Sequence, residues 1–595
     1  MEKQQTIECK EYRTHNCKKV NIEDKKVKLI GWLARKRDHG GKVFIDLRDY
    51  YGEIQIVFDS DTKNFNEIHN ISTESVLAIN GEVINRSEDT INSKIFNGDI
   101  EVQVVDWHIE SASDALPIQI NNSHEYPDEL RLKYRYLDMR NNAIKNNILL
   151  RTKVIKRMRE IMWSYGFNEY QTPILTASSP EGARDFVVPS RMHKGKFYAL
   201  PQAPQQFKQL LMVAGMDKYF QIAPCFRDED SRSDRSPADF YQLDIEMSFI
   251  TQKEIFILVE DLISIIFKEF STKKFIGFEK IKYNDAIESY ASDKPDLRNP
   301  IKIYDATEIF LNSQFTVFAN NAKKGMTIKI MCAKNTANKP RSFFDNLTKY
   351  AQDTLKSKGL AYITYDANQQ PKGPLVKFLT PEEIKQLESL CGATTQDTMF
   401  FISDNKKDSI RICHNLRCKL ADDLELIDND TFHFCWITDF PYFEEDNGNI
   451  DFSHNPFSMP QGGLEALNTD NLLDIMAHQY DLVCNGIELA SGAIRAHKPE
   501  IIYKAFELTG KSREYVDNTF AGLVTSLKYG APPHGGIAPG IDRIIMMLAD
   551  TENIREVICF PLNQKGEDLM MNAPSEIDNK HLNLLGLSKI TKVKK

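Results

Sequence analysis

The sequence has no apolar run that approaches the roughly 20 residues that a membrane-spanning helix needs. Its amino terminus, MEKQQTIECKEYRTHNCKKV, lacks both the apolar stretch of a secretory signal and the Arg- and Ser-rich pattern of a transit peptide. Hydrophobic residues make up 42% of the chain and charged residues 27%, which is close to the average for globular proteins. We therefore expect a soluble, cytoplasmic protein with no membrane partner.

Cysteine is sparse as well, with 10 in 595 residues and no regular spacing, which argues against a disulfide framework. Cys413, His414 and Cys418 lie close together, but their spacing is not that of a zinc knuckle and no second cluster completes four ligands. We interpret them as packing residues. The net charge of −9 argues against a protein that coats nucleic acid by bulk charge, although local basic patches can still bind it.

The segment from Val27 to Phe58 alternates between apolar and polar residues and is broken by short turns, which predicts antiparallel strands. Five or so such strands in about 100 residues favour an OB-type barrel, whose exposed strand face commonly binds oligonucleotides. In KVFIDLRD, Val43, Ile45 and Leu47 share one face, so Phe44 lies among polar groups on the other. The alternative is that Phe44 is a core residue and that the strand is read out of phase.

The rest of the chain mixes amphipathic helices with strand-like segments, and two strand-rich stretches could form one sheet-based domain around an insert. The predicted fold is therefore α+β and multidomain. The expected parts are an OB-fold barrel (1–112), a linker or hinge (113–145), the first part of the sheet-based domain (146–298), an inserted α+β domain (299–430), the second part of the sheet-based domain (431–561) and a C-terminal extension (562–595).

Two arginines stand where an anion is expected. Arg227 ends an apolar strand before a charged loop and a returning strand, and a guanidinium buried there needs a phosphate or carboxylate partner. Arg543 opens an apolar helix, whose positive end also favours an anion. Gly535, Gly536 and Gly540 just before it would allow close approach of a flat ligand. Taken alone, each arginine could equally belong to an ordinary ion pair.

Three segments resemble, in order, motifs 1, 2 and 3 of the class II aminoacyl-tRNA synthetases: the helix and strand that close on Pro173, the FRDED hairpin and the GIDR helix. Longer matches resemble the bacterial-type aspartyl-tRNA synthetases over nearly the whole chain: SPEGARDF, KGKFYALPQAPQQFKQLLM, SDKPDLRNP, NGIELASGAIRAH and PPHGGIAPGIDR. The resemblance implies an anticodon-binding OB fold, a class II antiparallel-sheet catalytic domain, an insert of the GAD type and a homodimer. It also implies a ligase that activates L-aspartate with ATP and Mg²⁺ and then transfers it to tRNA.

The resemblance also assigns roles to residues. Arg227 and Arg543 would be catalytic, because they neutralise charge on the α- and γ-phosphates, and Asp481 and Glu488 would carry Mg²⁺. The aspartate-binding residues would be Glu181, Gln205, Lys208, Arg227, Asp244, His454 and Arg495. The ATP-binding residues would be Arg227, Asp228, Glu229, Ser236, Phe240, Glu488, Gly540, Ile541, Asp542 and Arg543.

On the barrel, Arg37, Phe44 and Gln55 match the residues that read the anticodon, with Phe44 stacking on a splayed base. His39 follows in the turn after the first barrel strand. A histidine there resembles the branch that charges both tRNA(Asp) and tRNA(Asn), whereas the strict branch usually has leucine. The tRNA(Asn) product would then pass to a tRNA-dependent amidotransferase.

The sequence departs from the common family pattern at several positions. Ala203 stands where a serine is frequent, Asn455 where a second histidine is frequent, and the motif 2 loop is one residue longer, with Ser236 where a glutamine is frequent. These changes loosen single contacts and remove no charged group. Three alternatives stay open: a synthetase strict for tRNA(Asp), a sister synthetase for asparagine or lysine, and a non-catalytic tRNA-binding paralogue. Lys208 and Arg495 favour aspartate, since two cations suit an acidic side chain.

Overall fold

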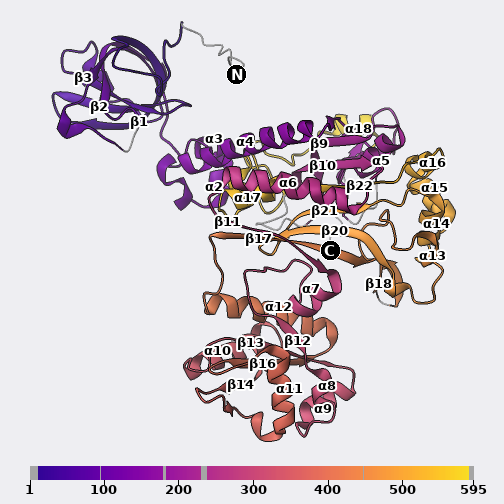
Figure 1. The fold of residues 1–595 in the computed structure, drawn as a ribbon. Coiled ribbons are helices and arrows are strands. Elements are labelled where there is room, and N and C mark those ends of the chain that lie inside the picture. The colour runs from indigo at the N-terminus through magenta and orange to yellow at the C-terminus, as the bar shows by residue number, and fades with distance from the viewer. Residues whose placement is uncertain (1–10, 94–95, 179–182, 230–237, 447, 589–595) are drawn as a thin grey trace. The chain divides into compact units, whose positions relative to one another are not determined.

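The computed structural model describes residues 11–93, 96–178, 183–229, 238–446 and 448–588, and Figure 1 shows its ribbon. The chain divides into two compact units, Met1–Tyr126 and Pro127–Lys595. The division falls inside the expected linker. Within the described ranges, no helix has both the length and the apolar character needed to cross a membrane, and the nine cysteines there are free thiols.

The first unit contains a closed five-stranded barrel in the order β1-β2-β3-β5-β4. Val43, Ile45 and Leu47 are fully buried in its core and Phe44 is only half-buried, which confirms the predicted phase of this strand. Gly31 allows close strand packing, because an added Cβ would lie 2.5 Å from the carbonyl oxygen of Arg48. The elements are β1 (Lys26–Asp38), β2 (Lys42–Arg48), β3 (Glu53–Asp59), α1 (Phe65–Ile68), β4 (Val76–Asn85) and β5 (Ile100–Ser111).

The second unit is built on an eight-stranded sheet in the order β11-β17-β20-β21-β22-β10-β9-β6. Neighbouring strands are antiparallel except in the β11–β17 and β6–β9 pairs. Strands from before the insert and strands from after it both belong to this sheet, so the two strand-rich stretches form one sheet, as predicted. The strands are β6 (Asn168–Glu169), β9 (Lys218–Phe226), β10 (Asp239–Ser248), β11 (Lys274–Lys282), β17 (Thr431–Pro441), β20 (Met476–Cys484), β21 (Ile487–Ile494) and β22 (His534–Pro539).

Helices α4 (Asn142–Ser164), α6 (Gln252–Phe270) and α17 (Ile541–Leu548) cover one face of this sheet and share its largest hydrophobic core. Trp436 of β17 stacks on Phe256 of α6 with ring centroids 4.1 Å apart. Smaller elements surround the sheet: α5 (Gln205–Val213), α7 (Tyr283–Tyr290), α13 (Gly463–Ala466), α14 (Pro499–Leu508), α15 (Arg513–Thr519), α16 (Ala521–Leu527), α18 (Asn579–Leu585), and the hairpins of β7 (Val187–Pro189) with β8 (Phe197–Ala199) and β18 (Phe443–Asp446) with β19 (Asn449–Phe452).

The inserted segment has a sheet of its own, in the order β12-β13-β16-β14-β15. Phe400 and Phe401 are neighbours on its central strand and are buried in two separate cores, so helices cover both faces. The elements are β12 (Ile303–Asp305), α8 (Thr307–Phe310), α9 (Thr316–Lys323), β13 (Thr327–Ala333), α10 (Arg341–Lys349), β14 (Ala361–Tyr365), β15 (Pro371–Lys372), α11 (Pro381–Cys391), β16 (Thr398–Asp404) and α12 (Lys406–Asp423).

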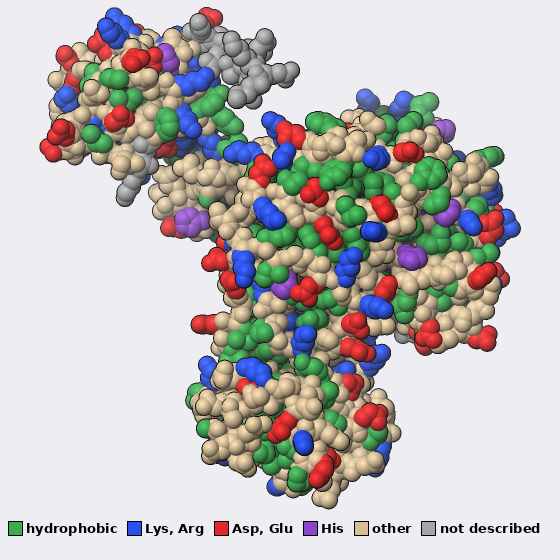
Figure 2. Space-filling view, in the orientation of Figure 1, with side chains coloured by type: hydrophobic (Ala, Val, Ile, Leu, Met, Phe, Trp, Pro, Cys, Tyr) green, Lys and Arg blue, Asp and Glu red, His purple; other side chains and the backbone are tan. Residues whose placement is uncertain are grey.

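The second half of the expected linker is helical, with α2 (Asp128–Lys133) and α3 (Arg135–Asp138). Arg131 bridges Asp138 and Glu556, with 2.9 Å from its Nη1 to Glu556 Oε1, and Arg135 donates to three main-chain oxygens between residues 555 and 559. This stretch is therefore packed against the chain near Glu556 and does not act as an open connector. On the face drawn in Figure 2, basic and acidic side chains are interspersed over the unit from Pro127 on.

Candidate active site

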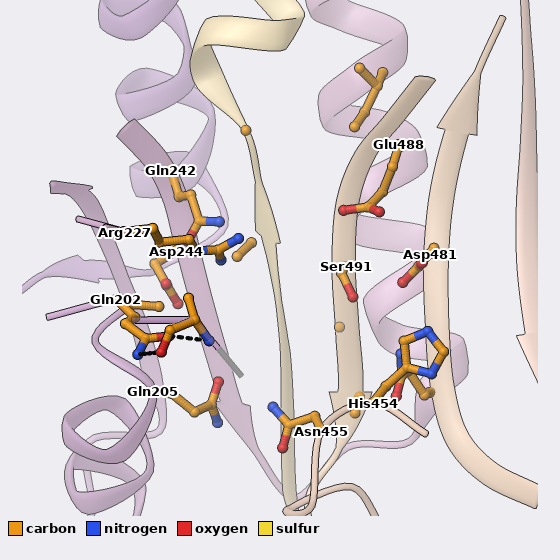
Figure 3. A pocket seen from close by; sticks show the side chains of 18 of the residues that line it. Gln202, Gln205, Arg227, Gln242, Asp244, His454, Asn455, Asp481, Glu488 and Ser491 are labelled. Atoms are coloured by element: carbon orange, nitrogen blue, oxygen red, sulfur yellow. Dashed lines mark hydrogen bonds between the residues drawn. The ribbon is translucent and has the colours of Figure 1, made fainter. Parts of the chain in front are cut away.

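A cavity of about 600 Å³ opens on the sheet face that the three helices leave free. Along β10, Leu243 and Ile245 enter the hydrophobic core, so Asp244 between them points to the opposite face. The same alternation on β20 turns Asp481 away from the core that holds Tyr480. The cavity size is typical of a small-molecule site. Figure 3 shows Arg227 and Asp244 on one side of the cavity and Asp481 and Glu488 on the other.

Four charged side chains form a closed set at one end of the cavity, and each is at most 3% exposed. The guanidinium of Arg495 donates to both carboxylate oxygens of Glu246, at 3.0 and 3.3 Å. Lys208 bonds to Asp244 and lies 3.3 Å from Glu246 Oε2. Burial raises the pKa of Asp244, whose Oδ2 has no hydrogen-bond partner among the described residues. Burial also acts to raise the pKa of Glu246, but Arg495 and Lys208 outweigh it and lower that pKa.

The glycines before Arg543 do not all serve the cavity. A Cβ on Gly536 would lie 2.0 Å from the carbonyl oxygen of Ile245 and 2.1 Å from Glu246 Oε2, and one on Gly535 would meet neighbouring strand atoms at 2.7 to 3.2 Å. The interpretation that these two allow a ligand to approach is therefore wrong, because protein atoms already fill that space. Gly540 does line the cavity, and a Cβ there would meet only ordinary contacts, at 3.6 Å or more.

The two predicted arginines lie in the same cavity. Arg227 follows β9, where its guanidinium lies 5.0 Å from the centre of the Phe240 ring and its buried Nε has no partner among the described residues. Arg543, at the start of α17, donates 2.7 Å to the carbonyl oxygen of Glu488 and lies 3.5 Å from that side chain. Asp542 points both carboxylate oxygens at protein donors, Arg151 and the amide of Tyr241, so it anchors α17.

The carboxylates of Asp481 and Glu488 come from the paired strands β20 and β21. Burial and the neighbouring Glu488 raise the pKa of Asp481, and its Oδ1 has no partner in the described part of the chain. For Glu488, burial acts to raise the pKa, but Lys294 and Arg543 outweigh it and lower that pKa. No group of three His, Cys, Asp or Glu side chains in the described ranges could hold a metal. A cation bound to this pair would thus complete its shell with water or with substrate oxygens.

The structure brings most of the predicted site residues together. His454 and Asn455 line the cavity from the loop after β19, and Ala203 and Gln205 line it near the start of α5. The cavity-lining members of the predicted set are Gln205, Lys208, Arg227, Glu229, Phe240, Asp244, His454, Asp481, Glu488, Arg495, Gly540, Asp542 and Arg543. Those that do not line it are Asp228 and the fully buried Ile541, and Glu181 and Ser236 fall outside the described residues.

The sequence patterns did not identify three residues that line or support the cavity. Glu246 fixes both buried cations, and it stands two residues after Asp244 in an apolar strand, so strand alternation could have found it. Lys294 lies 2.9 Å from Glu488, and Asp293 beside it also lines the cavity. They belong to the SDKPDLRNP segment, which carried the family resemblance but suggested no chemistry.

On the barrel, the predicted anticodon residues form one connected group. Arg37 bonds to both oxygens of Asp46, at 3.0 and 2.7 Å, and its Nη2 donates 3.0 Å to Gln55 Oε1. Phe44 pairs with Arg37 across β1 and β2, and the rings of Phe44 and His39 are nearly perpendicular, with centroids 5.5 Å apart. A half-buried aromatic ring beside an arginine and an amide is suited to stacking and hydrogen bonding with an unpaired base.

The chain resembles known proteins over nearly its full length. Residues 127–564 match the family of class II tRNA synthetases for D, K and N, and residues 27–110 match the OB-fold nucleic acid binding domain. It is 56% identical over 587 residues to an aspartate–tRNA(Asp/Asn) ligase of Ehrlichia chaffeensis, covering 98% of this chain and 99% of that one. It is 54% identical to the protein of the same name in Rickettsia felis, covering 97% and 98%.

Solved structures share the fold at low sequence identity. An asparaginyl-tRNA synthetase from Pyrococcus horikoshii, complexed with asparaginyl-adenylate, superimposes with a TM-score of 0.56 at 17% identity over 92% of this chain and 97% of that chain. A putative aspartyl-tRNA synthetase from Leishmania major gives a TM-score of 0.57 at 19% identity, covering 94% and 95%. These likenesses confirm the fold class. The substrate has to be inferred from the residues of the cavity.

Proposed function

The chain belongs to the family of class II tRNA synthetases for aspartate, lysine and asparagine, and from that premise we propose that it joins L-aspartate to tRNA(Asp) and tRNA(Asn). In the first step, a carboxylate oxygen of aspartate attacks the α-phosphorus of ATP, which forms aspartyl-adenylate and releases pyrophosphate. In the second, a ribose hydroxyl at the 3′ end of the tRNA takes the aspartyl group and releases AMP. The buried set of Lys208, Glu246 and Arg495 carries this proposal.

The amino acid would bind at the buried end of the cavity. Lys208 and Arg495 would hold its side-chain carboxylate, and Glu246 fixes both cations in place. Oδ2 of Asp244, which has no partner in the described part of the chain, would accept a hydrogen bond from the ammonium group. Asparagine has no charge in its side chain, so it would gain less from the two cations than aspartate does and bind poorly.

ATP would bind toward Arg227 and Arg543. Arg227 would neutralise the charge that develops on the α-phosphate, Phe240 would stack on the adenine, and Arg543 would meet the γ-phosphate. The pair Asp481 and Glu488 fits Mg²⁺, which binds to one or two carboxylates and completes its shell with substrate phosphates and water. When bound, Mg²⁺ would neutralise phosphate charge and orient the triphosphate.

The tRNA would be read by the barrel. Arg37, Phe44 and Gln55 would contact unpaired anticodon bases, and His39 beside Phe44 would accept the last base of either anticodon. The relatives in Ehrlichia and Rickettsia are named for both tRNAs, which supports the wider range. Aspartate on tRNA(Asn) would then be a substrate for an amidotransferase, and a cytoplasmic location goes with this activity.

A homodimer is supported by apolar side chains left exposed around the motif 1 region. Trp163, Ile174, Leu175 and Val187 are each at least 50% exposed. A twofold partner would bury them, since monomers rarely expose so many large apolar groups in one region. A monomeric mass in solution would count against this assembly. We also propose the domain bounds given above, with an insert of the GAD type over 299–430.

Aminoacylation with aspartate, with purified tRNA(Asp) and tRNA(Asn) side by side, tests the function. We expect both tRNAs to be charged. Charging of tRNA(Asp) alone would restrict the enzyme to the strict activity. Pyrophosphate exchange that responds to asparagine or lysine instead of aspartate would overturn the amino acid assignment, and no exchange with any of them would favour a non-catalytic tRNA-binding protein.

A further inference from the structure

A short segment, residues 291–302, joins α7 to the first strand of the inserted sheet and enters the cavity on its way. Lys294 in this segment places its Nζ 2.9 Å from Glu488 Oε2, and Asp293 lines the cavity beside it. The side chain of Lys294 is 40% exposed. A partly exposed ammonium therefore already pairs with one of the two carboxylates that fit a metal ion.

The segment is packed against the hairpin that carries those carboxylates. Gly486 forms the turn between β20 and β21 at φ +80°, and a Cβ added there would lie 3.5 Å from the Cβ of Asp296. Leu297 packs into a small core that β20 shares with β17 and α7. Since β20 bears Asp481 and β21 bears Glu488, a shift of this segment moves Lys294 relative to the acidic pair.

The last helix of the insert holds the same segment from the other side. Arg417 on α12 is 1% exposed, and its guanidinium donates to the carbonyl oxygens of Ile301, Asp296 and Asn299 at 2.6, 2.9 and 2.8 Å. The amide of Asn299 donates back to the carbonyl oxygen of Arg417 at 3.0 Å. The guanidinium also lies 5.1 Å from the ring centre of Tyr290. A planar fork with five donors suits this task better than an ammonium.

We propose that Lys294 is a positioning residue that pairs with Glu488 while the site is empty and releases it when the cation that accompanies ATP binds. In this proposal the insert fixes the position of Lys294 through the contacts of Arg417. The proposal rests on the proposed function for the role of that cation. Its physical basis is competition, because one carboxylate cannot give its full charge to an ammonium and to a divalent ion together. Asp481, whose buried Oδ1 has no hydrogen-bond partner among the described residues, would complete the pair.

Lys294→Met tests the competition, since it removes the charge and keeps most of the side-chain length. Binding of Mn²⁺ alone, followed by the loss of its free-ion EPR signal, should tighten about tenfold, the scale of one charge-assisted contact. Lys329→Met, which breaks the 3.0 Å pair with Asp305 inside the insert, should leave the binding unchanged. Equal Mn²⁺ binding by Lys294→Met and the parent enzyme, including none by either, would overturn the proposal.

Arg417→Lys tests the link to the insert. It should tighten Mn²⁺ binding in the same direction, and the double variant with Lys294→Met should bind no more tightly than Lys294→Met alone. Arg411→Lys on the same helix, whose partners are Asp408 and a carbonyl oxygen, is the matched control. If Arg417→Lys does not fold, Asn299→Ala loosens the same contact. Additive effects of Arg417→Lys and Lys294→Met on Mn²⁺ binding would refute the link. Absence of aspartate-dependent pyrophosphate exchange in the parent enzyme would refute only the proposed function.

Discussion

The two ends of the cavity are built in opposite ways. At the end where we propose that aspartate binds, called the aspartate end below, Lys208, Glu246 and Arg495 are buried and bonded to one another. At the end where we propose that ATP binds, called the ATP end, the buried Nε of Arg227 and Oδ1 of Asp481 have no partner among the described residues. A site that must reject asparagine benefits from charges that the protein already holds in place. A site that binds a highly charged triphosphate benefits from polar groups whose hydrogen-bond partners are supplied by the ligand.

The contrast predicts that damage to the aspartate end costs both folding and activity. Arg495→Met leaves Glu246 buried without its two-pronged partner, so the free energy of unfolding should fall by about 3–5 kcal/mol and aspartate activation should be lost. Urea unfolding and pyrophosphate exchange measure the two effects. Arg341→Met, whose side chain is 90% exposed, is the control and should change neither. A stable Arg495→Met enzyme would show that this end is not held by its ion pairs.

Damage to the ATP end should cost activity alone. Arg543 is 29% exposed and bonds to one carbonyl oxygen, so Arg543→Ala should change the free energy of unfolding by only about 0.5 kcal/mol. Adenylate formation should slow by about 10²–10³-fold, because a fixed cation is lost from the developing phosphate charge. Single-turnover adenylate formation and tRNA filter binding give the two measurements. Weakened tRNA binding would contradict the division of labour between cavity and barrel.

Two glycines, Gly536 beside Glu246 and Gly540 in the wall of the cavity, allow the same comparison with one kind of substitution. Gly536→Ala forces a methyl group onto Glu246 and the Ile245 carbonyl, so it should lower the free energy of unfolding by about 1–3 kcal/mol and weaken aspartate binding. Gly540→Ala meets only ordinary contacts and should leave stability nearly unchanged. Thermal unfolding of the two variants checks this ranking. Equal destabilisation would mean that the closeness of Gly536 to Glu246 is relieved by strand movement.

Local sequence patterns predicted much of the fold and of the candidate site. Contacts between residues far apart in the sequence were not predicted. The phase of β2 around Phe44 and the positions of Arg227 and Arg543 beside regular elements followed from alternation and helix boundaries, which span a few residues. The tie between Glu246 and Arg495 joins positions far apart in sequence, so no local pattern encodes it. The interpretation of Gly536 was wrong for the same reason, because the atoms that occupy the space of an added Cβ lie on β10.

The weakest test concerns His534, which lies behind the aspartate end and is fully buried. Its Nδ1 lies 2.8 Å from the carbonyl oxygen of Pro532, so Nδ1 carries the proton and Nε2 accepts from Gln209 at 3.1 Å. Burial lowers the pKa of His534 below its ordinary value. The unfolded chain therefore binds a proton more readily than the folded one, and the free energy of unfolding should decline as the pH falls below about 6.5.

His534→Gln should make that decline shallower, because it removes the group that must take up a proton on unfolding. Urea unfolding at several pH values between 7 and 5 measures the slope for the parent and the variant. His581→Gln is the control, since His581 is exposed and pairs with Asp578 at the surface. Parallel slopes for the parent and His534→Gln would show that the imidazole takes up its proton equally in the folded and unfolded states, so that it does not contribute to the loss of stability in acid.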